Sequence, residues 1–318
     1  MKQVYFHDNF ALKHTVMNTN LKIKKVYLHL FLLISALIYS NGASAQVYKN
    51  LKLLKETEIK VYYSAGHEQR SKDIAILAKN AIEYHSKLLG FKPKVTLLVL
   101  TGEDWSKHTT FPVYGMAHYK NDQTLVVATS DNDFWRSFIP PLHQLPSPLA
   151  AKIKRTYRTN DVKLSMQPFF DLLALHELGH AFHMQGNLTM QRKWMGELFC
   201  NIFLHTYISE NEPSLLPALE IFPEMVVAAG TAGYKFTALD EFENKYTELG
   251  KEHPKNYGWY QCRLHVAAKN IYNAGGKKVL VKLWKALRST SAKMDDKQFA
   301  SFLKRRVHPS VADVLLKW

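Results

Sequence analysis

The sequence predicts an α+β fold in which a small mixed β-sheet precedes a helical C-terminal lobe. β-rich runs alternate with one helical pattern up to about residue 129, whereas the chain after Pro168 shows helical spacing of its apolar residues. A hydrophobic content of 47% in 318 residues is ordinary for a globular protein and excludes a largely disordered chain. We therefore expect a leader over 1–45, an α/β sub-domain over 46–165 and a helical lobe over 166–318.

The first sub-domain is predicted to build the sheet. Glu58–Ser64 has the composition of a strand, and Lys94–Thr101 that of a buried strand. Between them, the apolar residues of Lys72–Leu89 recur at helical spacing, and a glycine ends the pattern. Val113–His118 and Thr124–Thr129 flank a polar turn and therefore predict a hairpin.

The second sub-domain is predicted to be helical. A long connection punctuated by prolines precedes it over 139–167, with a short helix expected over 149–156. The helices expected after it cover Phe169–Gln185, Lys193–Ser209, 257–274, 277–288 and 296–305.

The N-terminus has the pattern of a cleaved secretory signal. Three lysines over 22–25 precede the apolar run Val26–Tyr39, and small residues follow up to Ala45, after which we expect the cut. The alternative, a transmembrane anchor, is disfavoured because the run is short for a bilayer core of about 30 Å. Met17 would give a signal of normal length and is the expected start. The sequence thus predicts a secreted or periplasmic protein with no stable membrane insertion after cleavage.

The excess of basic residues predicts a positively charged, solvent-exposed surface. The formal net charge is +15, of which five lysines and one aspartate in residues 1–45 supply +4. The densest clusters, Lys152–Arg158 and Lys304–Arg306, are short, and no nucleic-acid-binding motif accompanies them. We therefore expect no nucleic-acid partner. The two cysteines, Cys200 and Cys262, could pair or remain buried thiols.

The segment 172–180 has the sequence LLALHELGH and contains the candidate metal-binding and catalytic residues. His176 and His180 are four residues apart, so on a helix both imidazoles share one face and can reach one metal ion. Glu177 would then lie beside the open coordination position as a general base. Burying these polar groups in so apolar a helix is costly without a partner, and a metal ion is the simplest one.

A catalytic zinc ion usually has three protein ligands, so a third is needed. His183 is disfavoured because residues 176 and 183 are separated by about 10 Å of helical rise, whereas zinc bonds are about 2 Å. Glu197 is the single acidic residue in the apolar stretch from Trp194 to Ile208. We therefore favour Glu197 as the ligand over the alternative of an exposed helical charge. Two histidines and one glutamate form an established catalytic zinc set.

The HELGH helix, the segment Trp194-Met-Gly-Glu197 on a following helix and the preceding hairpin resemble the gluzincin zinc peptidases, particularly the peptidase-MA-like group. The resemblance covers roughly residues 95–318 and is diffuse outside the two motifs. It implies a zincin-like fold, zinc bound by His176, His180 and Glu197, and Glu177 as the base. It also implies that an edge strand over Gly115–His118 pairs with an extended peptide.

The same resemblance implies a tyrosine that donates to the oxyanion of the reaction. Tyr260 fits the family's spacing to a helix-ending glycine at Gly275, and Tyr257 is the second candidate. A packing role for Tyr260 stays open, and Arg263 stands where the family usually has a glycine.

These motifs together predict a zinc-dependent metallopeptidase with one Zn²⁺ per chain and a peptide or protein substrate. Asn201 and Asp171 are candidates, by helical spacing, for orienting the ligands. Three alternatives stay open: a non-catalytic secreted binding protein that retains the zinc fold, a narrow-specificity amidase acting on cell-wall peptides, and a module that binds anionic surfaces through the Lys152–Arg158 cluster. The oligomeric state is not predicted.

Overall fold

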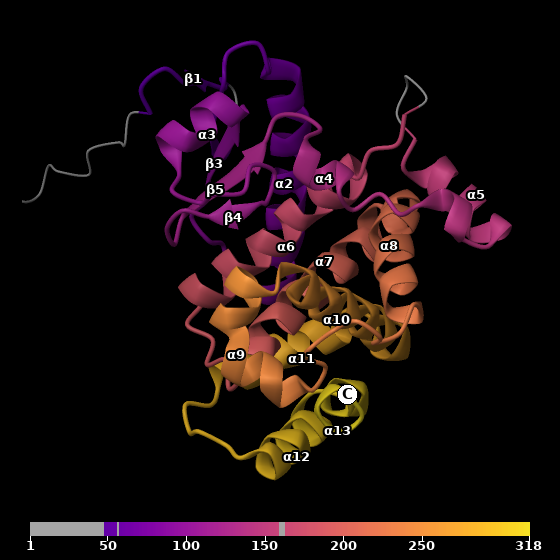
Figure 1. Ribbon diagram of the computed structural model, residues 1–318. Helices are drawn as coiled ribbons and strands as arrows, with labels where there is room; N and C mark the ends of the chain where they lie inside the picture. Colours follow the sequence, from indigo (N-terminus) through magenta and orange to yellow (C-terminus); the bar gives the residue numbers. More distant parts are fainter. Residues whose placement is uncertain (1–47, 56, 159–162) are drawn as a thin grey trace, which may run out of the picture. The chain divides into compact units, whose positions relative to one another are not determined.

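The computed structural model describes residues 48–55, 57–158 and 163–318 (Figure 1). Residues 50–318 form one compact unit. The predicted leader, with its start at Met17 and its cleavage after Ala45, lies outside the described residues. In the described part of the chain, no helix is long and apolar enough to cross a bilayer.

A mixed sheet forms the N-terminal layer of this unit. Its five strands are β1 (Lys52–Leu53), β2 (Lys60–Tyr63), β3 (Thr96–Leu100), β4 (His118–Tyr119) and β5 (Thr124–Ala128), in the spatial order β1-β2-β3-β5-β4. The three inner strands run parallel, and the two outer strands pair antiparallel with their neighbours. β3 and β5 are buried almost throughout, as expected of parallel strands covered on both faces. The predicted α+β class with a small mixed sheet is confirmed.

The edge of the hairpin differs from the sequence prediction. β4 contains only the two residues His118–Tyr119, so the strand predicted over Val113–His118 is a loop except at its last residue. Gly115 adopts a φ of +102°, and its carbonyl accepts a 2.7 Å hydrogen bond from the indole of Trp135. This left-handed residue turns the chain away from β5, which is why the edge strand expected over Gly115–His118 is shorter and displaced.

The helices of the N-terminal half are α2 (Glu68–Leu89), α3 (Gly102–His108), α4 (Asp133–Arg136) and α5 (Ser147–Thr156). α2 packs against both the sheet and the first helix of the C-terminal half. Its predicted end is confirmed at Gly90, whose φ of +67° is a left-handed conformation that glycine adopts without strain. α5 matches the short helix expected in the proline-rich connection.

The C-terminal half is helical, as predicted. Its helices are α6 (Gln167–Gln185), α7 (Lys193–Asn211), α8 (Leu216–Ala228), α9 (Leu239–Glu252), α10 (Pro254–Gly275), α11 (Lys277–Arg288), α12 (Asp296–Arg306) and α13 (Pro309–Leu316). α8, α9 and α13 were not among the predicted helices. Pro223 lies inside α8, and the backbone of α9 is non-helical at Lys245, so neither segment has an uninterrupted helical pattern.

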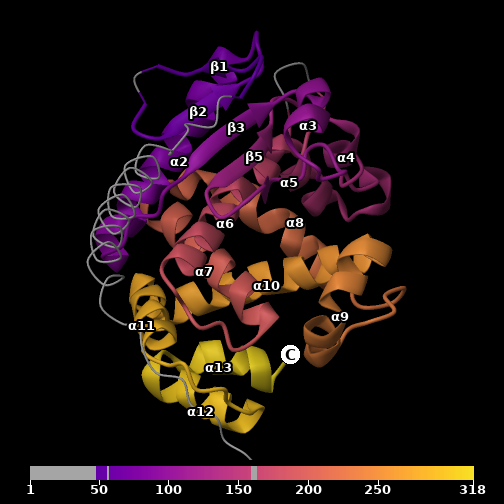
Figure 2. The same cartoon turned by 90° about the vertical axis from the view of Figure 1, so that its left-hand side faces the viewer.

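α6 lies between the two parts of the unit. Figure 2 shows the sheet on one side of α6, and α7 with α10 to α13 on the other. α6 packs against β4 and β5 as well as against α7, and α7 packs in turn against α10. All residues of α7 from Trp194 to Ile208 are buried. Cys200 of α7 and Cys262 of α10 are both buried free thiols. The HELGH segment therefore lies in the middle of the molecule, where its polar groups need partners.

Candidate metal centre

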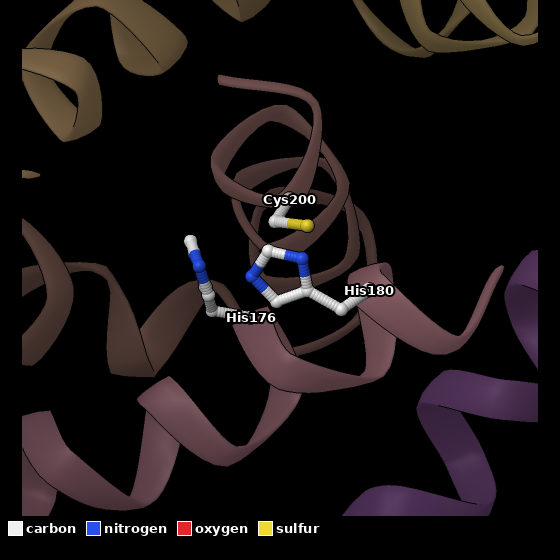
Figure 3. Close-up of side chains that lie close together, drawn as sticks. All are labelled: His176, His180 and Cys200. Carbon is white, nitrogen blue, oxygen red and sulfur yellow. The ribbon is translucent and has the colours of Figure 1, made fainter. Parts of the chain in front are cut away.

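Two helices approach each other closely where the HELGH segment lies. A Cβ atom added to Gly179 would lie 2.9 Å from Cα of Cys200 and 3.0 Å from its sulfur, so a larger residue would push α6 and α7 apart. His176 and His180 lie on either side of this glycine in the sequence. Figure 3 shows both imidazoles projecting from α6 beside Cys200 of α7. The glycine of the motif thus allows side chains of the two helices to meet.

The histidines face one carboxylate oxygen. Nε2 of His176 lies 3.2 Å from Oε2 of Glu197, and Nε2 of His180 lies 3.8 Å from the same atom. His176 and Glu197 are each only 5% exposed. Tetrahedral ligands with bonds of about 2.0–2.1 Å lie about 3.3–3.4 Å from one another, so the two distances from Nε2 to Oε2 are compatible with a shared divalent ion.

The other ring nitrogens are already occupied. Nδ1 of His176 lies 2.8 Å from Oδ1 of Asn201, and Nδ1 of His180 lies 2.9 Å from Nε2 of His183. An Nδ1–H that donates to a neighbour leaves the lone pair of Nε2 available, which is the arrangement of most metal-binding histidines. Asn201, a candidate from helical spacing, therefore contacts a predicted ligand. His183 contacts His180, the other predicted ligand.

Glu197 is held by side chains from α9 and α10. Tyr246 donates a 2.6 Å hydrogen bond to Oε1, and the amide of Gln261 donates a 3.0 Å hydrogen bond to Oε2. Burial by itself raises the pKa of this carboxyl. The hydrogen bond with His176, the charges of both histidines and the bond from Tyr246 outweigh that effect and hold the pKa well below its usual value. Glu197 is therefore ionised and oriented for a cation.

Cys200 is a second candidate ligand from α7. One donor atom from each of His176, His180 and Cys200 lies within 4.8 Å of the other two, so the described residues include a group that can hold a metal ion. Burial, followed by the charges of Glu197 and Glu177, raises the pKa of the thiol well above its usual value. The thiol therefore keeps its proton in the metal-free chain, whereas the neighbouring carboxylate of Glu197 is ionised. Imidazole with carboxylate or thiolate suits zinc.

Glu177 lies next to this group and is half-buried. Burial raises its pKa to about 8, with His176 opposing the shift and Glu197 adding to it. The edge strand β4, which contains Tyr119, packs against α6. Burial, followed by the charge of Glu177, raises the pKa of Tyr119 well above its usual value. The hydroxyl of Tyr119 has no hydrogen-bond partner among the described residues. Without a cation this carboxyl tends to keep its proton, whereas a divalent ion bound nearby would favour the carboxylate that a general base requires.

The two candidate tyrosines of α10 have different hydrogen-bond partners. The hydroxyl of Tyr260 donates to the carbonyl of Ala238 at 2.8 Å, and its ring stacks on Trp318. Tyr257, the second candidate, instead accepts a 2.8 Å hydrogen bond from Gln261, the residue that also contacts Glu197. Tyr257 therefore belongs to the site, and Tyr260 packs against the C-terminal residue.

Three contacting residues were missed by the sequence analysis: Tyr246, Gln261 and His265. The ring of His265 lies 6.1 Å from that of His176, measured between centroids. Tyr257, Gln261 and His265 follow one another at intervals of four along α10, so they share one face. That spacing is a signal from which the last two could have been found. Tyr246 carries no such signal, because it comes from α9.

Other acidic groups lie elsewhere. Asp171, the second candidate for orienting a ligand, forms a bidentate ion pair with Arg70 of α2. A further group that can hold a metal ion comprises Glu248, Glu252 and His253 at the end of α9. Glu248 is already paired with Lys245 at 3.1 Å, and Glu252 is exposed. Of these two groups of described residues, only the one on α6 and α7 combines burial with a set of oriented donors.

Comparisons with known proteins do not add to this picture. A scan against protein-family models, a search of curated proteins and a search of solved structures all found no match to the chain.

Proposed function

We propose that this chain is a zinc-dependent hydrolase of peptide bonds, a gluzincin-type peptidase with a zincin-like fold. The observation that carries the proposal is the convergence of both Nε2 atoms on Oε2 of Glu197, at 3.2 and 3.8 Å. Glu177 lies directly beside His176 on the same helix. His176, His180 and Glu197 would hold one Zn²⁺ per chain, with Cys200 as the competing candidate for the third position.

A bound zinc ion would polarise the scissile carbonyl and lower the pKa of a water molecule at the site. Glu177 accepts a proton from the attacking water and returns it to the leaving amine. Burial, with the charges of Glu197 and Glu177 contributing, raises the pKa of Tyr257 far above neutrality. Its phenol therefore keeps its proton and can donate to a developing oxyanion. Tyr257 takes this role in place of Tyr260.

The substrate is proposed to be a peptide or protein bound in an extended form. β4 is the outermost strand of the sheet on the side of β5, so its outer edge has no neighbouring strand among the described residues. β4 also packs against α6, which carries the histidines. An extended peptide could add to this edge through main-chain hydrogen bonds. The signal pattern in residues 1–45 supports secretion or periplasmic residence.

The decisive experiment compares the chain without residues 1–45 with its Glu177→Gln variant, both loaded with zinc. This protein retains the whole compact unit of residues 50–318. Each is incubated with a mixed peptide library, and new N-termini are counted by mass spectrometry. Cleavage by the parent that disappears in Glu177→Gln, with zinc still bound, is the expected result.

Two other outcomes separate the alternatives. If neither protein cleaves the library although both bind zinc, the general peptidase is ruled out, leaving a narrow amidase or a non-catalytic zinc protein. If the parent binds no zinc at micromolar concentration, the metal centre itself is wrong.

A further inference from the structure

α11 presents a basic face to solvent while its apolar face is fully used. The apolar side contains Val279, Leu280, Leu283, Trp284 and Leu287, all of them buried. The ring of Trp284 contacts the rings of Phe91, Phe182 and Phe199. Figure 2 shows α11 at the outside of the helical lobe. Only its polar face is therefore available to another molecule.

The exposed face of α11 carries positive charge only. Its cations are Lys277, Lys278, Lys282, Lys285 and Arg288. At 3.6 residues per turn, these five positions fall within an arc of about 140°. The sequence contains no acidic residue from 277 to 294. α11 therefore has a cationic face, within which half-buried Val281 is the one uncharged residue.

Three of these lysines lack an acidic partner. Lys277 pairs with Glu210 at 2.6 Å, and Arg288 lies over the ring of Trp284. Lys278, Lys282 and Lys285, by contrast, form no ion pair within the part of the chain that the structure describes. Like charges four residues apart on a helix oppose its formation. The pattern is therefore one that folding alone does not favour.

The neighbouring helix adds to this charge. α12 packs against α11 and carries Lys297, Lys304, Arg305 and Arg306, all exposed. Its two aspartates are engaged, since Asp295 caps the helix and Asp296 pairs with Arg192. In all, residues 277–306 contain ten lysines and arginines and two aspartates. We call this segment, residues 277–306, the basic surface.

We propose that the basic surface over 277–306 docks on anionic phospholipid headgroups, with the lysines of α11 as its main contacts. Lysine provides a mobile point charge, which suits a fluid array of phosphates, whereas arginine favours fixed bidentate partners. The exposed arc of α11 contains no aromatic residue on which an unpaired base could stack. Because the apolar face of α11 is buried, adsorption is electrostatic and involves no insertion. This docking is independent of the proposed hydrolysis.

The test uses a matched pair of charge variants of the chain without residues 1–45. One carries Lys278→Gln, Lys282→Gln and Lys285→Gln on α11. The other carries Lys152→Gln, Lys154→Gln and Arg155→Gln on α5, where the replaced side chains are also exposed and without an acidic partner in the described residues. Both variants lose three positive charges, and circular dichroism checks that both remain folded.

Binding is measured by co-sedimentation with vesicles of phosphatidylcholine, with and without about 30% phosphatidylglycerol, at about 0.1 M salt. The parent is expected to bind only the anionic vesicles, and less tightly as salt increases. Each lysine near such a surface contributes on the order of a fivefold gain in affinity, so the α11 variant should bind about 100-fold more weakly. The α5 variant should lose less than about threefold.

Three results would overturn the proposal. The first is that the parent does not bind anionic vesicles. The second is that both variants lose the same amount of affinity, which would indicate that net charge alone drives binding. The third is that the parent binds a double-stranded DNA fragment more tightly than the vesicles at the same salt, and through the same three lysines. That result would assign the basic surface to nucleic acid.

Discussion

The phenol of Tyr246 donates a 2.6 Å hydrogen bond to Oε1 of Glu197, while Oε2 of the same carboxylate faces the two histidines. Tyr246 directly follows Lys245, where the backbone of α9 leaves the helical conformation with a φ of −112°. The irregular residue thus adjoins Tyr246, which contacts a predicted ligand. We infer that Tyr246 positions Glu197 for metal binding.

Replacing Tyr246 with phenylalanine should weaken zinc binding by about 10- to 100-fold, the usual effect of removing a partner of a ligand. The affinity is measured by competition with a chromogenic chelator. Tyr260→Phe is the matched control, because it also removes one phenolic hydrogen bond, of 2.8 Å to the carbonyl of Ala238, which is not one of the predicted ligands. An equal loss of affinity in both variants would show that Tyr246 has only a packing role.

The third ligand can be decided by comparing Glu197→Gln with Cys200→Ala. Glu197→Gln should lower zinc affinity by at least about 100-fold, more than the loss of a residue that merely contacts a ligand. Cys200→Ala should still bind one zinc ion per chain, because both histidines and the carboxylate remain. Stoichiometry is determined by elemental analysis after dialysis. Retention of zinc by Glu197→Gln and its loss by Cys200→Ala would instead assign the thiol as the ligand.

The close crossing of α6 and α7 predicts a specific cost for a methyl group at Gly179. Gly179→Ala should lower the free energy of unfolding by about 1–3 kcal/mol, since the new Cβ meets the backbone of Cys200 at 2.9 Å. It should also weaken zinc binding by separating the ligands. Gly196 is the control, because a Cβ there would meet nothing within 4 Å.

Gly196→Ala should be neutral or should raise the free energy of unfolding by up to about 1 kcal/mol, because alanine favours the helix. Urea denaturation of the metal-free proteins measures the free energy of unfolding of both variants. If the two variants have the same stability, the crossing of α6 and α7 is looser than described.

His85 should make stability depend on pH. Its imidazole is fully buried and stacks on Phe203, and neither nitrogen has a hydrogen-bond partner among the described residues. Burial lowers its pKa well below the usual 6.5, so the folded chain keeps His85 neutral where the unfolded chain takes up a proton. The unfolded state therefore binds more protons below about pH 6.5, and stability falls as the pH decreases.

His85→Leu removes this proton linkage and an unsatisfied polar group. Relative to the parent, the free energy of unfolding of His85→Leu should increase by about 1 kcal/mol for each pH unit below 6.5. Urea denaturation at pH 8, 6 and 5 measures the difference, in which the contributions of the other histidines cancel. Parallel curves for the two proteins would mean that His85 is protonated alike in both states.

Patterns with a short period could be predicted from the sequence. The spacing of His176 and His180, the stop of α2 at Gly90 and the apolar runs of β3 and β5 each depend on neighbours within a few residues. The sequence also singled out Glu197, because it is the single acidic residue between Trp194 and Ile208 in an otherwise apolar stretch.

Contacts between segments that are distant in the chain could not be predicted. Tyr246 is 49 residues from Glu197, and the sequence around it contains no sign of that contact. The choice between Tyr257 and Tyr260 depends on the rotation of α10 against α7, and the two-residue length of β4 depends on the bond from Trp135 to Gly115.

By itself, the sequence determined which donors are present and which of them share a helix face, because helical geometry places residues four apart on one side. Tertiary structure decided which carboxylate oxygen, phenol and amide complete the group. Those partners come from α7, α9 and α10, and they meet only where the helices pack against one another around the glycine of the motif.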